Sequence, residues 1–202
     1  MVAQPKIYIA SMNMRGKWAD PVDPRSLKLN VTSAQGKTNL NRLCFSPMTH
    51  ENYKGFWNFE SYWQSGKVYE DIPEEVTKAY WKNLTEPKRR YPGSKGKKVL
   101  YADFGNGVHL DYVSSRKQVY VPEYYNLVRG NSVVDSWIDK FNSGNSITVY
   151  DFDGPRNENG EPECIEVTVE LLQEKINDVS FPFGHGYVVA GMIKEIHYDE
   201  YI

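Results

Sequence analysis

The stretch GFWNFESYWQSGKVY, from Gly55 to Tyr69, decides how the rest of the chain is interpreted. We expect a helix from Phe59 onward. One apolar stripe then holds residues at i, i+3, i+4 and i+7, namely Phe59, Tyr62, Trp63 and Gly66. A neighbouring stripe holds residues at i, i+4 and i+7, namely Glu60, Gln64 and Lys67. The first stripe would anchor the helix, and the second would present a carboxylate, an amide and an ammonium from a rigid element.

This second stripe has the chemistry of an acid/base group flanked by two ligand-positioning groups. The alternative is a solvated helix face on which a Glu and a Lys are loosely coupled. Three large aromatic residues, Trp57, Tyr62 and Trp63, lie close by in the sequence. They favour a site, because fully solvated faces seldom lie among large aromatic side chains.

The composition is that of an ordinary globular chain with an unusual share of aromatic residues. Of the 202 residues, 40% are hydrophobic and 25% are charged, enough to bury a sizeable core. Aromatic residues reach 14%, which suits a pocket for a flat ligand but equally an aromatic-rich core. The net charge of -2 predicts no global attraction to nucleic acid or to a membrane.

Several classes of protein are disfavoured because their motifs are missing. The sequence has no GxxxxGK[ST], GxGxxG, GxSxG or HExxH, and its four histidines lack metal-ligand spacing. We therefore predict neither a cofactor nor a metal site. Cys44 and Cys164 form no CxxC or disulfide framework, which fits a reducing cytoplasm. The N-terminal MVAQPKIYIASM has no apolar run long enough for a signal peptide or a membrane span.

The sequence before the central stretch predicts strands and loops. Strands are expected at Ile7–Ser11 and Leu27–Thr32, separated by a loop at Arg15–Pro24. The polar stretch Ser33–Arg42 should lead into another loop at Leu43–Thr49.

The sequence after the central stretch predicts mainly helices. A helix at Pro73–Leu84 should bury Val76, Tyr80, Trp81 and Leu84. A strand at Val99–Phe104 and a turn at Gly105–Gly107 should follow, and then a helix at Leu110–Val128 that is kinked or split at Pro122. The next expected elements are a helix capped by Ser132 and stopped near Gly144, a strand at Ile147–Phe152 and a polar loop at Asn157–Glu163. The last two are a helix capped by Thr168 that runs through Asn177, and a deeply packed helix from Tyr187. These patterns predict an α+β fold in one domain, 1–202, mainly helical with a few short strands.

Two further places carry candidate site residues. The strand Ile147–Phe152 ends in Asp151 and Asp153, followed by Arg156, which is typical of loop-borne chemistry but also of a turn with a local ion pair. Gly184, His185 and Gly186 precede the last helix. Free backbone N–H groups there would favour a phosphate, and close backbone packing is the alternative explanation.

The stretch Thr85–Lys98 is the most basic part of the chain. Its six basic residues are Lys88, Arg89, Arg90, Lys95, Lys97 and Lys98. A solvated loop is the simplest interpretation, and contact with the phosphates of a polynucleotide is the functional one.

The motifs around the central helix carry a family resemblance. FSPM at Phe45–Met48, followed by WNFESYWQSGKVY at Trp57–Tyr69, resembles the NADAR family, also called the YbiA-like fold. Leu110–Tyr125 looks like that family's Asp-Trp-Glu helix, with Tyr112 in place of the Trp, and Gly186–Val189 is similar to its Gly-rich entry into the last helix. The resemblance touches roughly half of the chain and leaves residues 1–42 and the basic loop unmatched.

The resemblance implies N-glycosidase chemistry. Members of the family act on ribosyl-aminopyrimidines of early riboflavin synthesis, or remove ADP-ribose from modified guanine bases, often near phage-defence or toxin genes. Breaking a ribosyl C–N bond passes through an oxocarbenium-like state, which a nearby carboxylate stabilises. Glu60 is expected to act near C1′ or to activate a water, with Asp151 or Asp153 as the second acid.

The same resemblance implies how a substrate is held. The expected binding residues are Ser46 and Gln64 from the matched motifs, Trp57, Trp63 and Tyr112 for stacking, and Lys67, Arg156, Gly184, His185 and Gly186 for phosphates. The expected partner is a nucleotide-like small molecule or ADP-ribosylated nucleic acid. Three alternatives stay open: a non-catalytic nucleotide or ADP-ribose sensor, a glycosyl- or ADP-ribosyl-transferase acting on nucleic acid, and a structural or virion-associated domain with an aromatic core.

Overall fold

A four-stranded mixed sheet forms the centre of the fold. The structure is a computed structural model and describes residues 4–34 and 39–202. The strand order is β2 (Leu27–Asn30), β7 (Ile147–Asp151), β1 (Ile7–Ser11) and β8 (Cys164–Glu166). The first three strands are parallel, and β8 runs antiparallel to β1. β1 and β7 lie inside the sheet and are buried along their whole length, as their apolar sequences predict.

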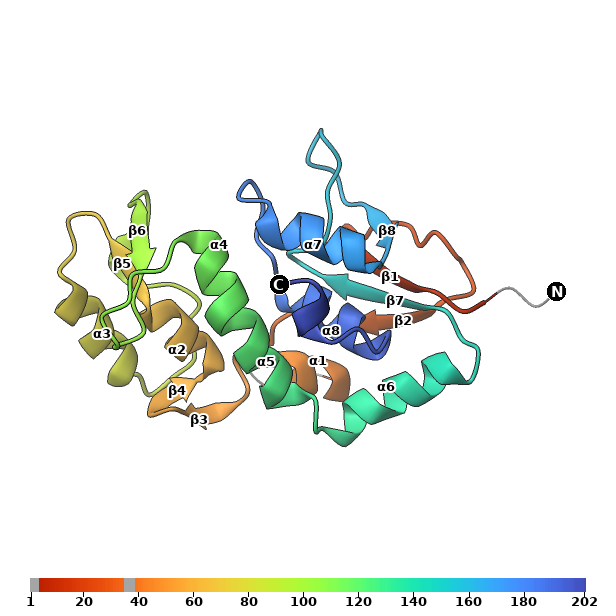
Figure 1. The fold of residues 1–202 in the computed structure, drawn as a ribbon, viewed down its shortest axis with the longest axis horizontal. Helices are drawn as coiled ribbons and strands as arrows, with labels where there is room; N and C mark the ends of the chain where they lie inside the picture. The colour runs from red at the N-terminus through yellow and green to blue at the C-terminus, as the bar shows by residue number, and fades with distance from the viewer. Residues whose placement is uncertain (1–3, 35–38) are drawn as a thin grey trace.

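The two faces of the sheet are covered differently. Alternate residues such as Ile9 and Val149 face a helical layer built on α8 (His185–Ile193), which packs against β1 and β7. The neighbouring helices of this layer are α6 (Ser132–Asn142) and α7 (Val169–Asn177) (Figure 1). On the other face, Tyr150 packs with Ala10 and Ala19 under the loop that joins β1 to β2.

The second part of the fold surrounds the central stretch of the sequence. It consists of β3 (Glu51–Tyr53), β4 (Phe56–Asn58), α2 (Phe59–Ser65), β5 (Lys67–Tyr69), α3 (Glu74–Lys82) and β6 (Val99–Ala102). α2 begins where predicted, because the Asn58 side chain accepts a hydrogen bond from the Ser61 N–H. It ends at Ser65, so Lys67 belongs to β5 and not to the helix. A Cβ at Gly66 would lie 2.5 Å from the Phe104 ring, which explains a glycine at this point.

A segmented helix joins the two parts (Figure 1). α4 (Tyr112–Ser115) continues through a π-helical turn (Arg116–Tyr120) into α5 (Val121–Val128). The sequence predicted one helix kinked or split at Pro122, and the irregularity is this π-helical turn just before that proline. On α5, Glu123 accepts hydrogen bonds of 2.5 Å from both the Tyr53 hydroxyl and the Lys54 ammonium. The long helix is thereby tied to the β3–β4 hairpin.

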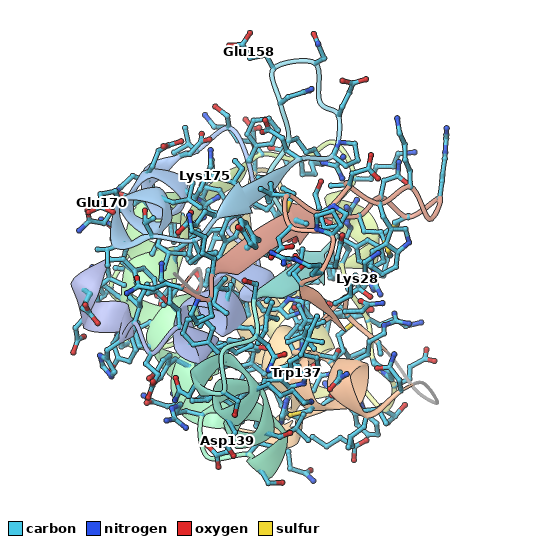
Figure 2. The ribbon with its side chains drawn as sticks, turned by 90° about the vertical axis from the view of Figure 1, so that its right-hand side faces the viewer. Lys28, Trp137, Asp139, Glu158, Glu170 and Lys175 are labelled. Carbon is cyan, nitrogen blue, oxygen red and sulfur yellow. The ribbon has the colours of Figure 1, made fainter. Side chains whose placement is uncertain are left out.

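Most of the other predicted elements are present. α7 starts after Thr168, whose side chain accepts from the Leu171 N–H, and it ends at Asn177 as predicted. Residues 105–107 form the expected turn, with Gly105 and Gly107 at positive φ. The cap of α6 is Asn131, one residue before the predicted Ser132. The loop at Asn157–Glu163 is also present, and Figure 2 shows Glu158 at its tip, away from the body of the molecule.

Three further parts of the structure differ from what the sequence predicted. The expected loop at Leu43–Thr49 begins inside α1 (Leu40–Phe45), because the Asn39 side chain caps a short helix that buries Cys44 and Phe45. The strand β8 was not predicted, since its three residues are extended only through pairing with β1. In α3 the buried side chains are Thr77 and Trp81, whereas Val76 is exposed. Part of the polar stretch Ser33–Arg42, residues 35–38, and residues 1–3 of the N-terminal stretch lie outside the described residues.

The fold is therefore α+β, as predicted, with more residues in helices than in strands. In the described part of the chain, no helix combines the length and the apolar character that a membrane crossing requires.

Candidate active site

A cavity of about 460 Å³ lies between the end of β7 and the central helix α2. Nine of the residues predicted for the site line it: Glu60, Trp63, Gln64, Lys67, Tyr112, Asp151, Asp153, Gly184 and His185. They come from separate parts of the chain, at 60–67, 112, 151–153 and 184–185, so only the folded chain brings them together. The volume falls in the range of roughly 300–1,000 Å³ typical of small-molecule sites.

Glu60 lies in the first turn of α2, held by two hydrogen bonds. Its backbone N–H donates to the Pro47 carbonyl at 3.0 Å, and its Oε1 accepts from Gln64 Nε2 at 2.7 Å. Burial raises the pKa of Glu60, while the hydrogen bond from Gln64 and the charge of Lys67 lower it. The second stripe of the predicted helix thus orients one carboxylate towards the cavity.

Lys67 faces the same cavity from the start of β5. Burial lowers the pKa of Lys67, and the charge of Arg90 adds to that effect, while the Glu60 carboxylate opposes it. The ammonium lies 5.9 Å from the centre of the Trp63 ring, within the range of a cation–π contact. Lys67 therefore borders both the Glu60 carboxyl group and an aromatic wall.

Asp151 ends β7 and meets the first turn of α8. Its Oδ2 accepts a hydrogen bond of 2.9 Å from the Gly186 N–H, and its Oδ1 accepts one of 2.8 Å from the Phe152 N–H. A Cβ at Gly184 would lie 2.9 Å from Asp151 Oδ2, and a Cβ at Gly186 would lie 2.5 Å from the Asp151 Cβ. The glycines expected to receive a phosphate instead allow close packing, and a carboxylate of the chain itself occupies this helix end.

His185 is buried beside Asp151. Its Nε2 lies 2.6 Å from the Val31 carbonyl, and since a carbonyl only accepts, Nε2 carries a proton. Its Nδ1 lies 3.4 Å from Asp151 Oδ2. The imidazole therefore connects β7 to the segment after β2, with one edge at the cavity wall.

Asp153 is the freer of the two aspartates. Asp153 lines the cavity and is exposed to solvent, whereas Asp151 is buried. Burial, and next the charge of Asp151, raise the pKa of Asp153 to about 6. The site thus contains a carboxyl group that exchanges its proton close to neutral pH.

Four predicted binding residues do not line the cavity. The Ser46 hydroxyl is buried between the backbone N–H and C=O of Ala34. Trp57 is half-buried on β4, and Gly186 donates to Asp151. Arg156 donates to the carbonyls of Gly160 and Phe152, so it braces its own loop.

Other wall residues were not predicted for the pocket. Arg89 and Arg90 come from the basic loop, and Tyr120 and Arg116 come from the π-helical turn. Burial raises the pKa of Tyr120 far above its usual value, so its hydroxyl stays protonated. No local pattern marks these residues, because their place in the wall depends on how distant segments pack.

The basic loop therefore divides into two groups. Arg89 and Arg90 face the cavity, and Arg89 also donates to the Ser33 carbonyl. Lys88 pairs with Glu86 and Lys97 pairs with Asp71 on the surface, whereas Lys95 and Lys98 are exposed.

Across residues 4–34 and 39–202, no three His, Cys, Asp or Glu side chains are grouped closely enough to hold a metal ion. No family model, curated protein or solved structure matches the chain significantly.

Proposed function

We propose that the protein is a hydrolase of an N-glycosidic bond to a ribosyl group, with an ADP-ribose-like or ribosyl-aminopyrimidine substrate. One observation carries this proposal: the cavity holds both the oriented Glu60 carboxylate and Asp153, whose pKa is raised to about 6. A pair of carboxyl groups, one to donate a proton and one to activate a water, is what glycoside hydrolysis requires. The likeness of the central motifs to the NADAR family supports the same chemistry.

The two carboxyl groups take different roles. Asp153, protonated in part of the molecules near neutral pH, donates its proton to the leaving nitrogen as the C1′–N bond breaks with both electrons going to that nitrogen. Glu60, whose ionised form is favoured by Gln64 and Lys67 against the effect of burial, accepts a proton from a water whose oxygen bonds to C1′. The products are the free base and the ribosyl hydroxyl compound. Proton exchange with solvent then restores Asp153 and Glu60.

The cations of the wall suit the phosphates of such a substrate. Arg89, Arg90 and Lys67 all border the cavity, and guanidinium groups bind phosphate oxygens in pairs. Asp151 and His185 are positioning residues, because their polar atoms hold β7, α8 and the segment after β2 together. The proposed site therefore binds phosphate at its basic side and carries out the chemistry near Glu60.

The test is to incubate the purified protein with DNA carrying ADP-ribosylated guanosine and, separately, with the phosphoribosylamino-pyrimidine of riboflavin synthesis. Mass spectrometry then measures the released ADP-ribose or ribose phosphate. Wild type is expected to release one of them, and Glu60→Gln to be slower by about 10²–10⁴. The matched control is Glu70→Gln, on an exposed side chain after β5 that should keep the wild-type rate.

Two other outcomes would overturn the hydrolase proposal. No release, together with tight ADP-ribose binding in calorimetry, would identify a sensor that keeps the pocket without the chemistry. Neither release nor binding would leave the motif resemblance without a functional counterpart.

A further inference from the structure

A second cavity of about 330 Å³ adjoins the first, between β6 and α4. Its wall consists of Trp63, Lys67, Val99, Leu100, Tyr101, Ala102, Phe104, Leu110, Tyr112 and Ser115. Four of these, Trp63, Lys67, Val99 and Tyr112, also line the first cavity. The two cavities therefore share one boundary, made by two aromatic rings, an ammonium and a valine.

The second cavity differs chemically from the first. Among the described residues that line it there is no carboxylate, and most of the side chains are aliphatic or aromatic. The rings of Trp63 and Phe104 stack with centroids 5.8 Å apart and planes 20° apart. Leu100 remains 51% exposed although it is a large apolar residue. Flat apolar walls with few polar groups suit a planar ring system.

We propose that this second cavity binds the planar heteroaromatic base that the proposed hydrolysis would release. The identification of the ring as a leaving group depends on the proposed function, whereas its binding depends only on the cavity. The stacked Trp63–Phe104 wall and the continuity of the two cavities point to an aromatic ring as the occupant.

The shared boundary explains how one substrate would occupy both cavities. Glu60 and Trp63 are neighbours on the same helix, so a ribose beside Glu60 lies next to the aromatic boundary. The base attached to C1′ then extends past Trp63 into the second cavity, and the phosphates remain beside Arg89 and Arg90. Lys67, present in both walls, can donate a hydrogen bond to a ring nitrogen or carbonyl of the base.

The test separates the base from the sugar phosphate by using two probes. Guanosine and cytidine carry a base without phosphate, and ribose 5-phosphate carries phosphate without a base. The variant is Leu100→Asp, which places a charge in the wall of the second cavity. The control is Val108→Asp, because Val108 is 50% exposed and lines neither cavity, so both substitutions add one charge at a half-exposed aliphatic position.

We expect wild type and Val108→Asp to bind one of the two nucleosides with the same Kd in calorimetry. In Leu100→Asp that Kd should rise tenfold or more, while the Kd of ribose 5-phosphate should stay unchanged. Circular dichroism checks that each variant is folded, and Leu110→Ala, which enlarges the same wall, serves as a second variant expected to weaken nucleoside binding. Failure of both nucleosides to bind wild type, or equal binding to all variants, overturns the proposal.

Failure of this inference is distinguishable from failure of the proposed function. Nucleoside binding that depends on Leu100, without any hydrolysis, supports the base site and counts against the hydrolase. Hydrolysis together with nucleoside binding that is unchanged in Leu100→Asp supports the hydrolase and overturns the base site.

Discussion

The backbone N–H of Gly186 donates a hydrogen bond of 2.9 Å to the Asp151 carboxylate, which joins the start of α8 to the end of β7. A Cβ at Gly186 would lie only 2.5 Å from the Asp151 Cβ, so a larger residue has no space there. Because Asp153 follows Asp151 and His185 precedes Gly186, this contact also positions two groups of the cavity wall.

Gly186→Ala is expected to destabilise the fold by about 1–3 kcal/mol, as overpacking does in a tight core. The new methyl group meets the short Asp151 side chain, which has little freedom to move away. Urea unfolding followed by circular dichroism measures the change. Gly130→Ala is the matched control, because a Cβ there meets no heavy atom within 4 Å and the backbone has no positive φ. An equal loss in both variants would contradict the close approach at Gly186.

Asp153→Asn is expected to remove a pH dependence of stability. The pKa of Asp153 is raised in the folded chain from 3.8 to about 6, so its ionisation is less favourable there than in the unfolded chain. Wild type should therefore lose stability as the pH rises from about 4 to about 6, by no more than about 1 kcal/mol because solvent screens this exposed group. Urea midpoints measured across this range should fall more in wild type than in Asp153→Asn, and Asp139→Asn on α6 should behave as wild type.

The same substitution is expected to change catalysis. If Asp153 is the proton donor, wild-type release of the base falls as the pH rises through about 6, because the protonated form disappears. Asp153→Asn should be slower by about 10²–10⁴ and should lack this decline. A pH–rate profile of kcat/KM for both proteins decides the point. A decline that persists unchanged in the variant would assign the proton to another group.

Lys67→Met is expected to move the acidic side of that profile upward. The Lys67 charge favours the ionised form of Glu60, so its removal raises the pKa of Glu60 further. Activity that needs ionised Glu60 should then appear only at higher pH than in wild type. Lys67→Arg keeps the positive charge and should retain the wild-type midpoint. An unchanged midpoint in Lys67→Met would show that the two groups are not coupled in solution.

Arg116→Met is expected to destabilise the fold by about 3 kcal/mol or more. The buried guanidinium donates to the carbonyls of Ile176, Asp178 and Phe181, and its loss would leave these acceptors without a charged donor. Arg129→Met is the control, because its ion pair with Asp135 is exposed and worth roughly 0–1 kcal/mol. Thermal or urea unfolding compares the two, and a similar small loss in both would contradict the structural role of Arg116.

Elements with a local signal could be predicted from the sequence. Thr168 caps α7 with its own side chain, and the apolar period of the central stretch predicts that α2 begins at Phe59. α1 and β8 could not be predicted, because the six residues of α1 and the three of β8 are too few to show a period. β8 is extended only because it pairs with β1. In α3 the apolar Val76 lies on the solvent side, since Trp81 and Thr77 face the rest of the fold.

The residues of the candidate site likewise fall into those that a local pattern predicts and those that only long-range packing brings together. Glu60, Gln64 and Lys67 reach one cavity because helix and strand geometry relate them locally, and Asp153 follows a predictable strand end. Arg89, Arg90 and Tyr120 reach it only through long-range packing. The Gly-His-Gly pattern marks the start of α8, but the Asp151 carboxylate occupies the place predicted for a phosphate, so the close-packing explanation of these glycines is the correct one.

The sheet has a consequence for how the protein is made. Its two interior strands pair Ile7 with Ile147, so almost three-quarters of the chain must be synthesised before β1 finds its neighbour. Closing such a long loop costs entropy before any strand contact is gained, which slows folding. Until then the apolar segment Ile7–Ser11 has no β7 to pair with, and an unpaired apolar segment of this kind is prone to associate with other chains.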